Sequence, residues 1–125
     1  MKVILPVFLS TVWISVSEFI RNEFLFKSYW VSHYEQMGLK FPDAPVNGAM
    51  WGVWAVIFSA IIYYISKKHT LTETFILSWV LGFVLMWIVI GNLGVLPFGL
   101  LFAAVPLSLL EAYVAAFIIF KLAKK

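Results

Sequence analysis

The sequence predicts an all-α integral membrane protein: four transmembrane helices in an antiparallel bundle, with an amphipathic outer interfacial helix after or continuing helix one. Hydrophobic residues fill 63% of the 125 positions and charged residues 12%. A soluble domain of this size needs more polar surface to cover its core. Four stretches are also apolar enough over about 20 residues to cross a bilayer. The expected transmembrane helices are about 4–21, 48–66, 71–93 and 97–121, with the interfacial helix at about 23–37, in a single domain over 1–125.

Helix one is expected to begin near Ile4, with Pro6 in its first turns, where a missing N–H costs little. Its apolar character fades after Val16, yet no glycine or further proline interrupts the chain before Gly38. Four large side chains recur at helical spacing in this second half: Phe26, Trp30, Tyr34 and Met37. They predict an amphipathic helix at the outer interface, either continuous with helix one or bent from it.

Helix two follows a turn-rich connection, LKFPDAPVNG, which contains two prolines and a glycine. Small residues then recur at spacings of four, three and four: Gly48, Gly52, Ala55 and Ser59. Such a face lets another helix approach closely, so we expect it to serve helix packing. The next connection, SKKHT, is short, which makes helices two and three antiparallel neighbours.

Helices three and four each carry one local signal. Thr70 and Glu73 fit a capping box, in which Thr70 is the N-cap and Glu73 reaches back to its N–H. In helix four, Pro106 frees the carbonyl of Phe102, which predicts a bend one turn before Glu111.

The distribution of lysine and arginine predicts the orientation. One set of loops and ends carries Lys2, Lys67, Lys68, Lys121, Lys124 and Lys125, and the other carries Arg21, Lys27 and Lys40. The larger set belongs on the cytoplasmic side, so we expect a multi-pass protein of a bacterial inner (plasma) membrane with both termini cytoplasmic. The net charge of +3 then reflects topology and contact with anionic lipid headgroups in the bilayer. The sequence has no basic cluster on a soluble face, so nothing in it indicates a nucleic-acid partner.

Two polar stripes face the expected interior of the bundle. Helix one carries Thr11, Ser15, Glu18 and Asn22 on one stripe, with Arg21 beside it, and helix four carries Ala104, Ser108, Glu111 and Ala115. At about 1.5 Å per residue, Glu111 lies roughly 15 Å above the inner interface and Glu18 roughly 24 Å. The expected proton-binding or ligand-binding cluster is Glu18, Arg21, Asn22, Ser108 and Glu111.

Two interpretations of this cluster stay open. Ionisable groups inside a membrane commonly bind a proton, a cation or a substrate. Alternatively, a Glu–Arg pair fastens helix one to helix four, and Glu111 is either protonated or paired with Arg21. Two acids compete for Arg21, which favours the first interpretation. A third alternative is a lipid-modifying enzyme that uses Glu18 and Arg21 at the outer interface.

Other kinds of site find little support. The absence of cysteine removes thiolate nucleophiles and thiolate metal sites, and no catalytic residue, cofactor or metal is expected. His33 and His69 are expected in different loops on opposite sides of the membrane. Trp30, Trp51 and Trp54 fall near the outer interface, where they could form a quaternary-ammonium cage, although an aromatic belt explains them more simply.

The stretch NEFLFKSYWVSHYEQMG, followed by a proline turn and three membrane helices, resembles a family of small four-helix bacterial inner-membrane proteins classed as a domain of unknown function. In its members, an aromatic residue and the stretch Leu-Phe-Gly-Lys are followed shortly by a tryptophan and then by a glycine. The matching positions are Phe24, Leu25, Phe26, Lys27, Trp30 and Gly38, with Phe26 where the family has glycine before lysine. The resemblance implies fold and location only.

The size and four-helix plan are also similar to small multidrug resistance transporters, whose helix one carries a membrane-embedded glutamate at a place comparable to Glu18. The neighbouring residues differ, and Arg21 would oppose a cationic drug. Small fluoride channels share only the size, because their glycine, asparagine and phenylalanine motifs are missing. The lysine bias further disfavours the dual topology of both groups.

The sequence thus predicts a small inner-membrane protein that forms a homo-oligomer, or joins a partner membrane protein, and binds a proton or small ligand within the membrane. Transport is one use of such a site. The alternative is a non-catalytic accessory or scaffold subunit whose buried Glu and Arg are structural.

Overall fold

The computed structural model describes residues 3–40 and 45–123, and every regular element in them is helical. Four helical stretches are long and apolar enough to span a membrane: Ile4–Leu25, Pro45–Ser66, Leu71–Asn92 and Phe98–Ala123. The predicted all-α fold with four membrane helices is therefore confirmed.

The first span combines two kinds of helix. An α-helix, α1 (Ile4–Phe19), passes directly into a single π-helical stretch, η1 (Ile20–Leu25), and the chain bends at Phe26 before α2 (Lys27–Gln36). At this bend Phe26 has φ −116° and ψ 0°, and its N–H donates to the carbonyl of Arg21, five residues back. The outer helix is thus bent from helix one, which was one of the two expected arrangements.

The second span is one α-helix, α3 (Pro45–Ser66), which begins three residues before the expected start. The third span is α4 (Leu71–Trp79), a π-helical stretch η2 (Val80–Val84) and α5 (Leu85–Asn92). The fourth is a short 3₁₀ turn, η3 (Phe98–Leu100), and α6 (Leu101–Ala123), which contains Pro106 and stays helical through it.

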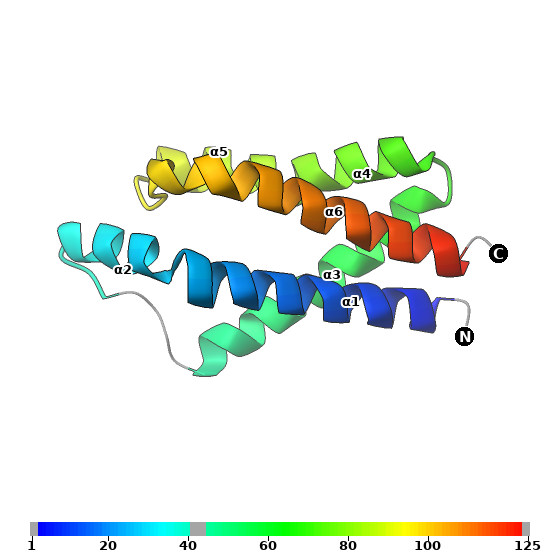
Figure 1. Ribbon diagram of the computed structural model, residues 1–125, viewed down its shortest axis with the longest axis horizontal. Helices are drawn as coiled ribbons and strands as arrows, with labels where there is room; N and C mark the ends of the chain where they lie inside the picture. The colour runs from blue at the N-terminus through cyan, green and yellow to red at the C-terminus, as the bar shows by residue number, and fades with distance from the viewer. Residues whose placement is uncertain (1–2, 41–44, 124–125) are drawn as a thin grey trace.

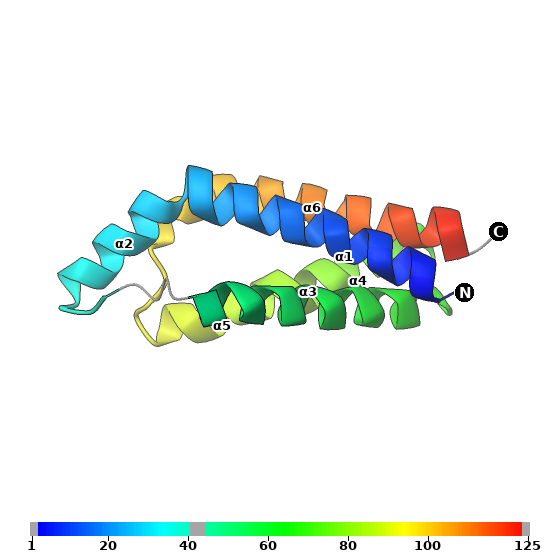
Figure 2. The same cartoon turned by 90° about the horizontal axis from the view of Figure 1, so that it is seen from below.

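The helices form two layers, one of α1 and α6 and one of α3 with α4–α5 (Figure 2). Within this arrangement α1 packs against α3 and α6, and α4 packs against α3 and α6. Successive spans run in opposite directions, so both ends of the chain lie at one end of the bundle (Figure 1). The loop between α5 and η3 lies beside α2 at the other end.

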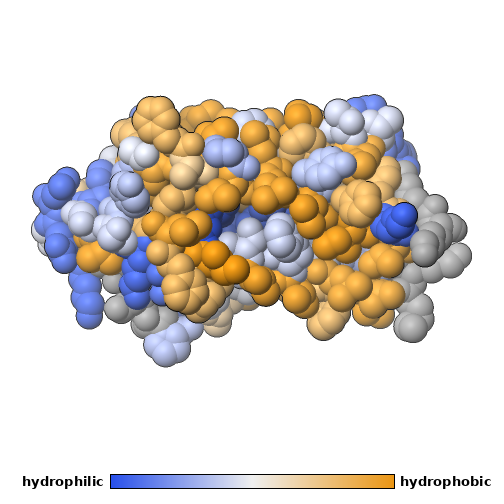
Figure 3. All heavy atoms as spheres, viewed as in Figure 1, coloured by the Kyte–Doolittle hydropathy of each residue, from blue (hydrophilic) through white to orange (hydrophobic). Residues whose placement is uncertain are grey.

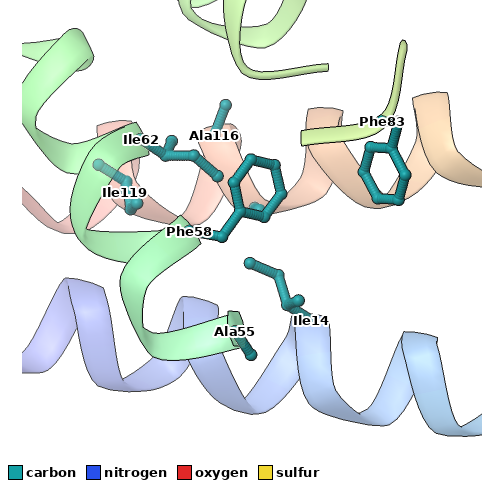
Figure 4. Packing of buried hydrophobic residues seen from close by; sticks show 8 residues of the cluster. Ile14, Ala55, Phe58, Ile62, Phe83, Ala116 and Ile119 are labelled. Atoms are coloured by element: carbon teal, nitrogen blue, oxygen red, sulfur yellow. The ribbon is translucent and has the colours of Figure 1, made fainter. Parts of the chain in front are cut away.

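The main core is formed by side chains from all four spans (Figure 4). Phe58 and Ile62 of α3 meet Ile14 of α1 and Phe83 of η2, and α6 contributes alanines at the contact. A close approach occurs at Gly82, where an added Cβ would lie 2.6 Å from two ring atoms of Phe58. Glycine is therefore favoured here by space, since a side chain would overlap that ring unless the ring shifts.

A second buried cluster closes the end of the bundle where α2 lies. Phe26 packs with Leu96, Leu100 and Ala104, so the bend between η1 and α2 is held against the start of α6. His33 also contacts the carbonyl of Gly94 through Nε2 at 2.8 Å. The expectation that His33 lies in a loop was wrong, because it belongs to α2 and joins this helix to the turn between α5 and η3.

The first of the two bonds of the predicted capping box is present at the N-terminus of α4. Thr70 Oγ1 accepts the backbone N–H of Glu73 at 3.1 Å. The Glu73 carboxylate accepts the Thr70 hydroxyl at 3.2 Å and contacts His69 Nδ1 at 2.9 Å. His69 therefore lies at the opposite end of the bundle from His33.

The surface has the pattern that a bilayer requires. Apolar side chains occupy much of the middle of the face in Figure 3, and hydrophilic residues gather at the end where α2 lies. Several large apolar side chains are strongly exposed, including Phe102 at 92% and Phe24 at 73%. Exposed side chains of this kind suit helices that are long and apolar enough to cross a bilayer.

Candidate functional site: a buried charge cluster

The cluster begins with two charged residues on the first span. Glu18 is 5% exposed and Arg21 is 7% exposed. Arg21 Nη2 donates to Glu18 Oε1 at 2.5 Å, and Asn22 Nδ2 donates to Glu18 Oε2 at 2.9 Å. Both oxygens of the Glu18 carboxylate are thus paired, as the spacing of three and four residues along a helix allows.

The π-helical stretch η1 contributes to this geometry. A π turn adds one residue to a helical turn, and such turns often occur at functional sites. The Asn22 side chain also donates to the backbone carbonyl of Glu18 at 3.1 Å. Arg21 extends toward the second π-helical stretch, where its Cζ lies 5.1 Å from the centre of the Phe83 ring. A guanidinium over an aromatic face at this distance is stabilised by the ring quadrupole.

Glu111 of α6 faces the same arginine from across the bundle. Its side chain is fully buried, and Oε1 lies 3.8 Å from Arg21 Nη1. Neither carboxylate oxygen of Glu111 has a hydrogen-bond partner among residues 3–40 and 45–123, and nor does Arg21 Nη1. The arginine is thus engaged by Glu18 and only approaches Glu111.

The backbone at Glu111 is fixed more firmly than its side chain. Trp13 Nε1 of α1 donates to the carbonyl oxygen of Glu111 at 2.9 Å. This bond joins the two helices that carry the acids. It fixes the position of the Glu111 backbone along the bundle axis. The carboxylate, by contrast, has no hydrogen-bond donor among the described residues.

The charges of the cluster do not balance if both acids are ionised. Two carboxylates then face one guanidinium, with a net charge of −1. In the described part of the chain, no second cationic side chain lies within ion-pair distance of either acid. An unpaired charge in a medium of low dielectric constant is strongly disfavoured, so a proton or a bound cation would restore neutrality.

The Ser108 hydroxyl forms hydrogen bonds with residues other than Glu18 and Glu111. Its hydroxyl accepts Trp79 Nε1 at 2.9 Å and donates to the carbonyl of Val105 at 3.0 Å. It lies one turn before Glu111 on the same helix. The structure therefore brings together Glu18, Arg21, Asn22 and Glu111, and it directs Ser108 toward α4.

The small-residue face of α3 divides into two parts. Ala55 and Ser59 are buried in the bundle, where Ser59 Oγ donates to Ser10 Oγ of α1 at 3.4 Å. A Cβ added at Gly48 or Gly52 would meet no atom within 4 Å. Helix packing within this chain thus uses only the inner half of the predicted face.

The outer half of that face borders a groove. A hollow of about 310 Å³ lies between α1 and α3 and is lined by Ser15, Glu18 and Asn22 on one side and Gly48 and Gly52 on the other. The absence of side chains at the two glycines leaves this space open. Glu18 is accordingly reachable from the groove, whereas Glu111 is enclosed.

Sequence reasoning missed three aromatic partners of the cluster. Trp13 and Trp79 each donate their indole N–H into the bundle, and Phe83 lies under Arg21. Nothing in their spacing separates them from ordinary apolar residues. Two buried hydroxyls on α4, Thr74 and Ser78, were also missed, and neither has a hydrogen-bond partner within the described residues.

The residues described by the structure contain no group of three His, Cys, Asp or Glu side chains that could hold a metal ion. No protein-family model matches the sequence, and no curated protein and no solved structure matches it. The resemblance to the inner-membrane family of unknown function therefore stays a prediction, and the arguments about function depend on the site itself.

Proposed function

We propose that the protein reversibly binds a proton at Glu111, inside the membrane, beside a permanent Glu18–Arg21 ion pair. The observation that carries this proposal is the fully buried Glu111 carboxylate, which has no hydrogen-bond donor among residues 3–40 and 45–123 although a guanidinium lies 3.8 Å away. A carboxyl group in this position is neutral when it holds a proton, which removes the excess negative charge. We propose that the protein uses proton binding at Glu111 for proton-coupled transport.

The charged groups that face Glu111 all come from α1. Glu18 and Arg21 are the other two buried charged side chains among the described residues. The buried polar residues of α3 and α4 are hydroxyls: Ser59, Ser66, Thr74 and Ser78. Any change in the Glu18–Arg21 pair is therefore expected to alter the proton affinity of Glu111 directly, and this coupling is what a proton-linked transporter requires.

A permeation path or binding cavity in this proposal forms between chains. Four short helices enclose little space alone, and the open positions Gly48 and Gly52 offer a contact for a second copy or a partner membrane protein. We place the protein in a bacterial inner membrane with both termini cytoplasmic. Lys67, Lys68 and Lys121 support this orientation, since they lie at the end of the bundle opposite α2. The expected contributions of Lys2, Lys124 and Lys125 lie outside the described residues.

The alternative proposal is an accessory or scaffold subunit in which the charges are structural. The bond from Trp13 to the Glu111 carbonyl and the contact of Arg21 with Phe83 favour it, because both hold helices together. In this alternative Glu111 never exchanges its proton, and the protein carries no flux.

Infrared spectroscopy of protonated carboxyl groups tests the proposal. We expect a protonated-carboxyl band that is lost in Glu111→Gln and that titrates reversibly in the folded wild type. Glu35→Gln is the matched control, because Glu35 is an exposed residue of α2 and its loss should leave the band unchanged. Proteoliposomes should also lose proton-coupled flux in Glu111→Gln while the variant stays folded. A band that never titrates, together with no proton-coupled flux in the wild type, would leave the scaffold as the function.

A further inference from the structure

A second, larger hollow lies at the outer end of the bundle, where α2, α3 and α5 meet η1. Its volume is about 580 Å³, within the range of small-molecule sites. Asn22, Glu23, Gly48 and Trp51 border both this cavity and the groove that reaches Glu18. The two spaces are therefore neighbours, with the larger one farther from the buried charge cluster.

The walls of this outer cavity are unusually aromatic. Trp30, Tyr34, Trp51 and Trp54 all contribute to it. The rings of Trp51 and Trp54 lie 6.2 Å apart at an angle of 76°. Trp54 is in turn packed on the core ring of Phe58, with centroids 4.9 Å apart. One aromatic wall is thus held in place by the core, which reduces the ordering cost of binding a ligand against it.

The charge of the cavity has one sign. Among the residues that the structure describes, Glu23 lines it and Glu18 lines the adjoining groove, whereas no lysine, arginine or histidine among them lines either space. Lys27 pairs with Glu23 at 3.3 Å, but it stays outside the lining. An anionic ligand would meet no counter-charge here. Aromatic faces combined with a carboxylate are the chemistry that recognises alkylated ammonium groups.

We propose that the outer cavity binds an alkylammonium cation, held by the faces of Trp51 and Trp54 and by the charge of Glu23. An aromatic belt would turn these rings toward lipid, but Trp30 and Trp54 are only partly exposed and border a shared hollow. The proposed cation contacts, Trp51, Trp54 and Glu23, are not among the side chains that bind the proton, and Asn22 alone both borders the cavity and donates to Glu18. The cation is either a free solute or the headgroup of a lipid.

Binding of choline to the protein in maltoside micelles tests this site. Isothermal titration should show choline binding at least about fivefold tighter than its neutral isostere, 3,3-dimethylbutan-1-ol, because only the charged form gains a cation–π interaction. Trp51→Leu should weaken choline binding about fivefold or more. Glu23→Gln should weaken it about fivefold, as expected for loss of one charge near 4 Å in a solvated site.

Both substitutions should leave the fold intact, because Trp51 is 44% exposed and Glu23 makes only a surface ion pair. Tyr64→Leu is the matched control, since Tyr64 is an aromatic residue of α3 that is 76% exposed and lies outside the cavity. Its choline affinity should equal that of the wild type. Equal affinity for choline and the neutral isostere, or unchanged choline affinity in both cavity variants, would overturn the proposal.

The two sources of the cation are separated by the surrounding lipid. If a lipid headgroup is the occupant, choline should bind more weakly in phosphatidylcholine nanodiscs than in nanodiscs of digalactosyldiacylglycerol, because phosphatidylcholine competes for the cavity. Neither lipid has a net charge, so neither concentrates choline at its surface. If a free solute is the occupant, the two affinities should agree. In both cases Trp51→Leu must lower choline binding in the digalactosyldiacylglycerol nanodiscs.

Discussion

Replacing Arg21 by methionine should destabilise the protein far more than replacing Glu111 by glutamine. Arg21 forms a buried ion pair with Glu18 at 2.5 Å and lies 3.8 Å from Glu111. At an effective dielectric constant of about 20, the charges of Glu18 and Arg21 attract by about 6–7 kcal/mol before desolvation is subtracted, whereas a protonated Glu111 adds no charge–charge attraction. Breaking a buried pair typically costs about 3–5 kcal/mol, because the remaining charge loses its partner. We expect that loss in the free energy of unfolding of Arg21→Met.

Glu111→Gln should change the free energy of unfolding by about 1 kcal/mol or less, because the substitution keeps the shape and breaks no hydrogen bond of the carboxylate. Reversible unfolding in mixed maltoside–SDS micelles, followed by tryptophan fluorescence, measures both variants. The double variant Glu18→Gln/Arg21→Met removes both charges and should recover most of the lost stability. Equal costs for the two single variants, or a double variant as unstable as Arg21→Met, would refute this account of the cluster.

Two further predictions concern the fold that holds the cluster. Gly82→Ala should lower the free energy of unfolding by about 1–3 kcal/mol, because the new methyl group would lie 2.6 Å from the Phe58 ring. Gly52→Ala, which meets no atom within 4 Å, is its control and should not be destabilised. Thr70→Ala removes the side-chain cap of α4 and should cost about 1 kcal/mol in the same unfolding measurement. A Thr70→Ser variant that unfolds like Thr70→Ala would contradict the capping role.

The four membrane helices were predictable because the bilayer imposes length and apolarity on each span. Glu18, Arg21 and Asn22 were also predictable as a local group, since residues three and four apart lie side by side on any helix. The expected depth of Glu111 in the membrane was enough to place it near these three residues. These inferences use distances along one helix or along the membrane normal, which depend little on how the helices turn.

What the sequence did not reveal depends on the rotation of each helix about its axis. A uniform period of 3.6 residues underlies every stripe drawn from spacing. The π-helical stretches η1 and η2 break that period, so Phe26 reaches the outer core and Phe83 reaches Arg21. Whether Gly48 contacts a helix or borders a hollow likewise depends on the tilt of α3, which spacing does not determine.

The two π turns have a consequence for how the chain tolerates changes in length. They lie at one level of the bundle, because Arg21 of the first contacts Phe83 of the second. Removing one residue from either turn would restore an α-helical turn and leave the helix beyond it in nearly the same rotational position, because a π turn accommodates one extra residue. The same deletion in an α-helical segment would rotate everything beyond it by about 100°. Single-residue deletions within η1 or η2 should therefore preserve the packing of the flanking helices better than single-residue deletions within α1 or α4.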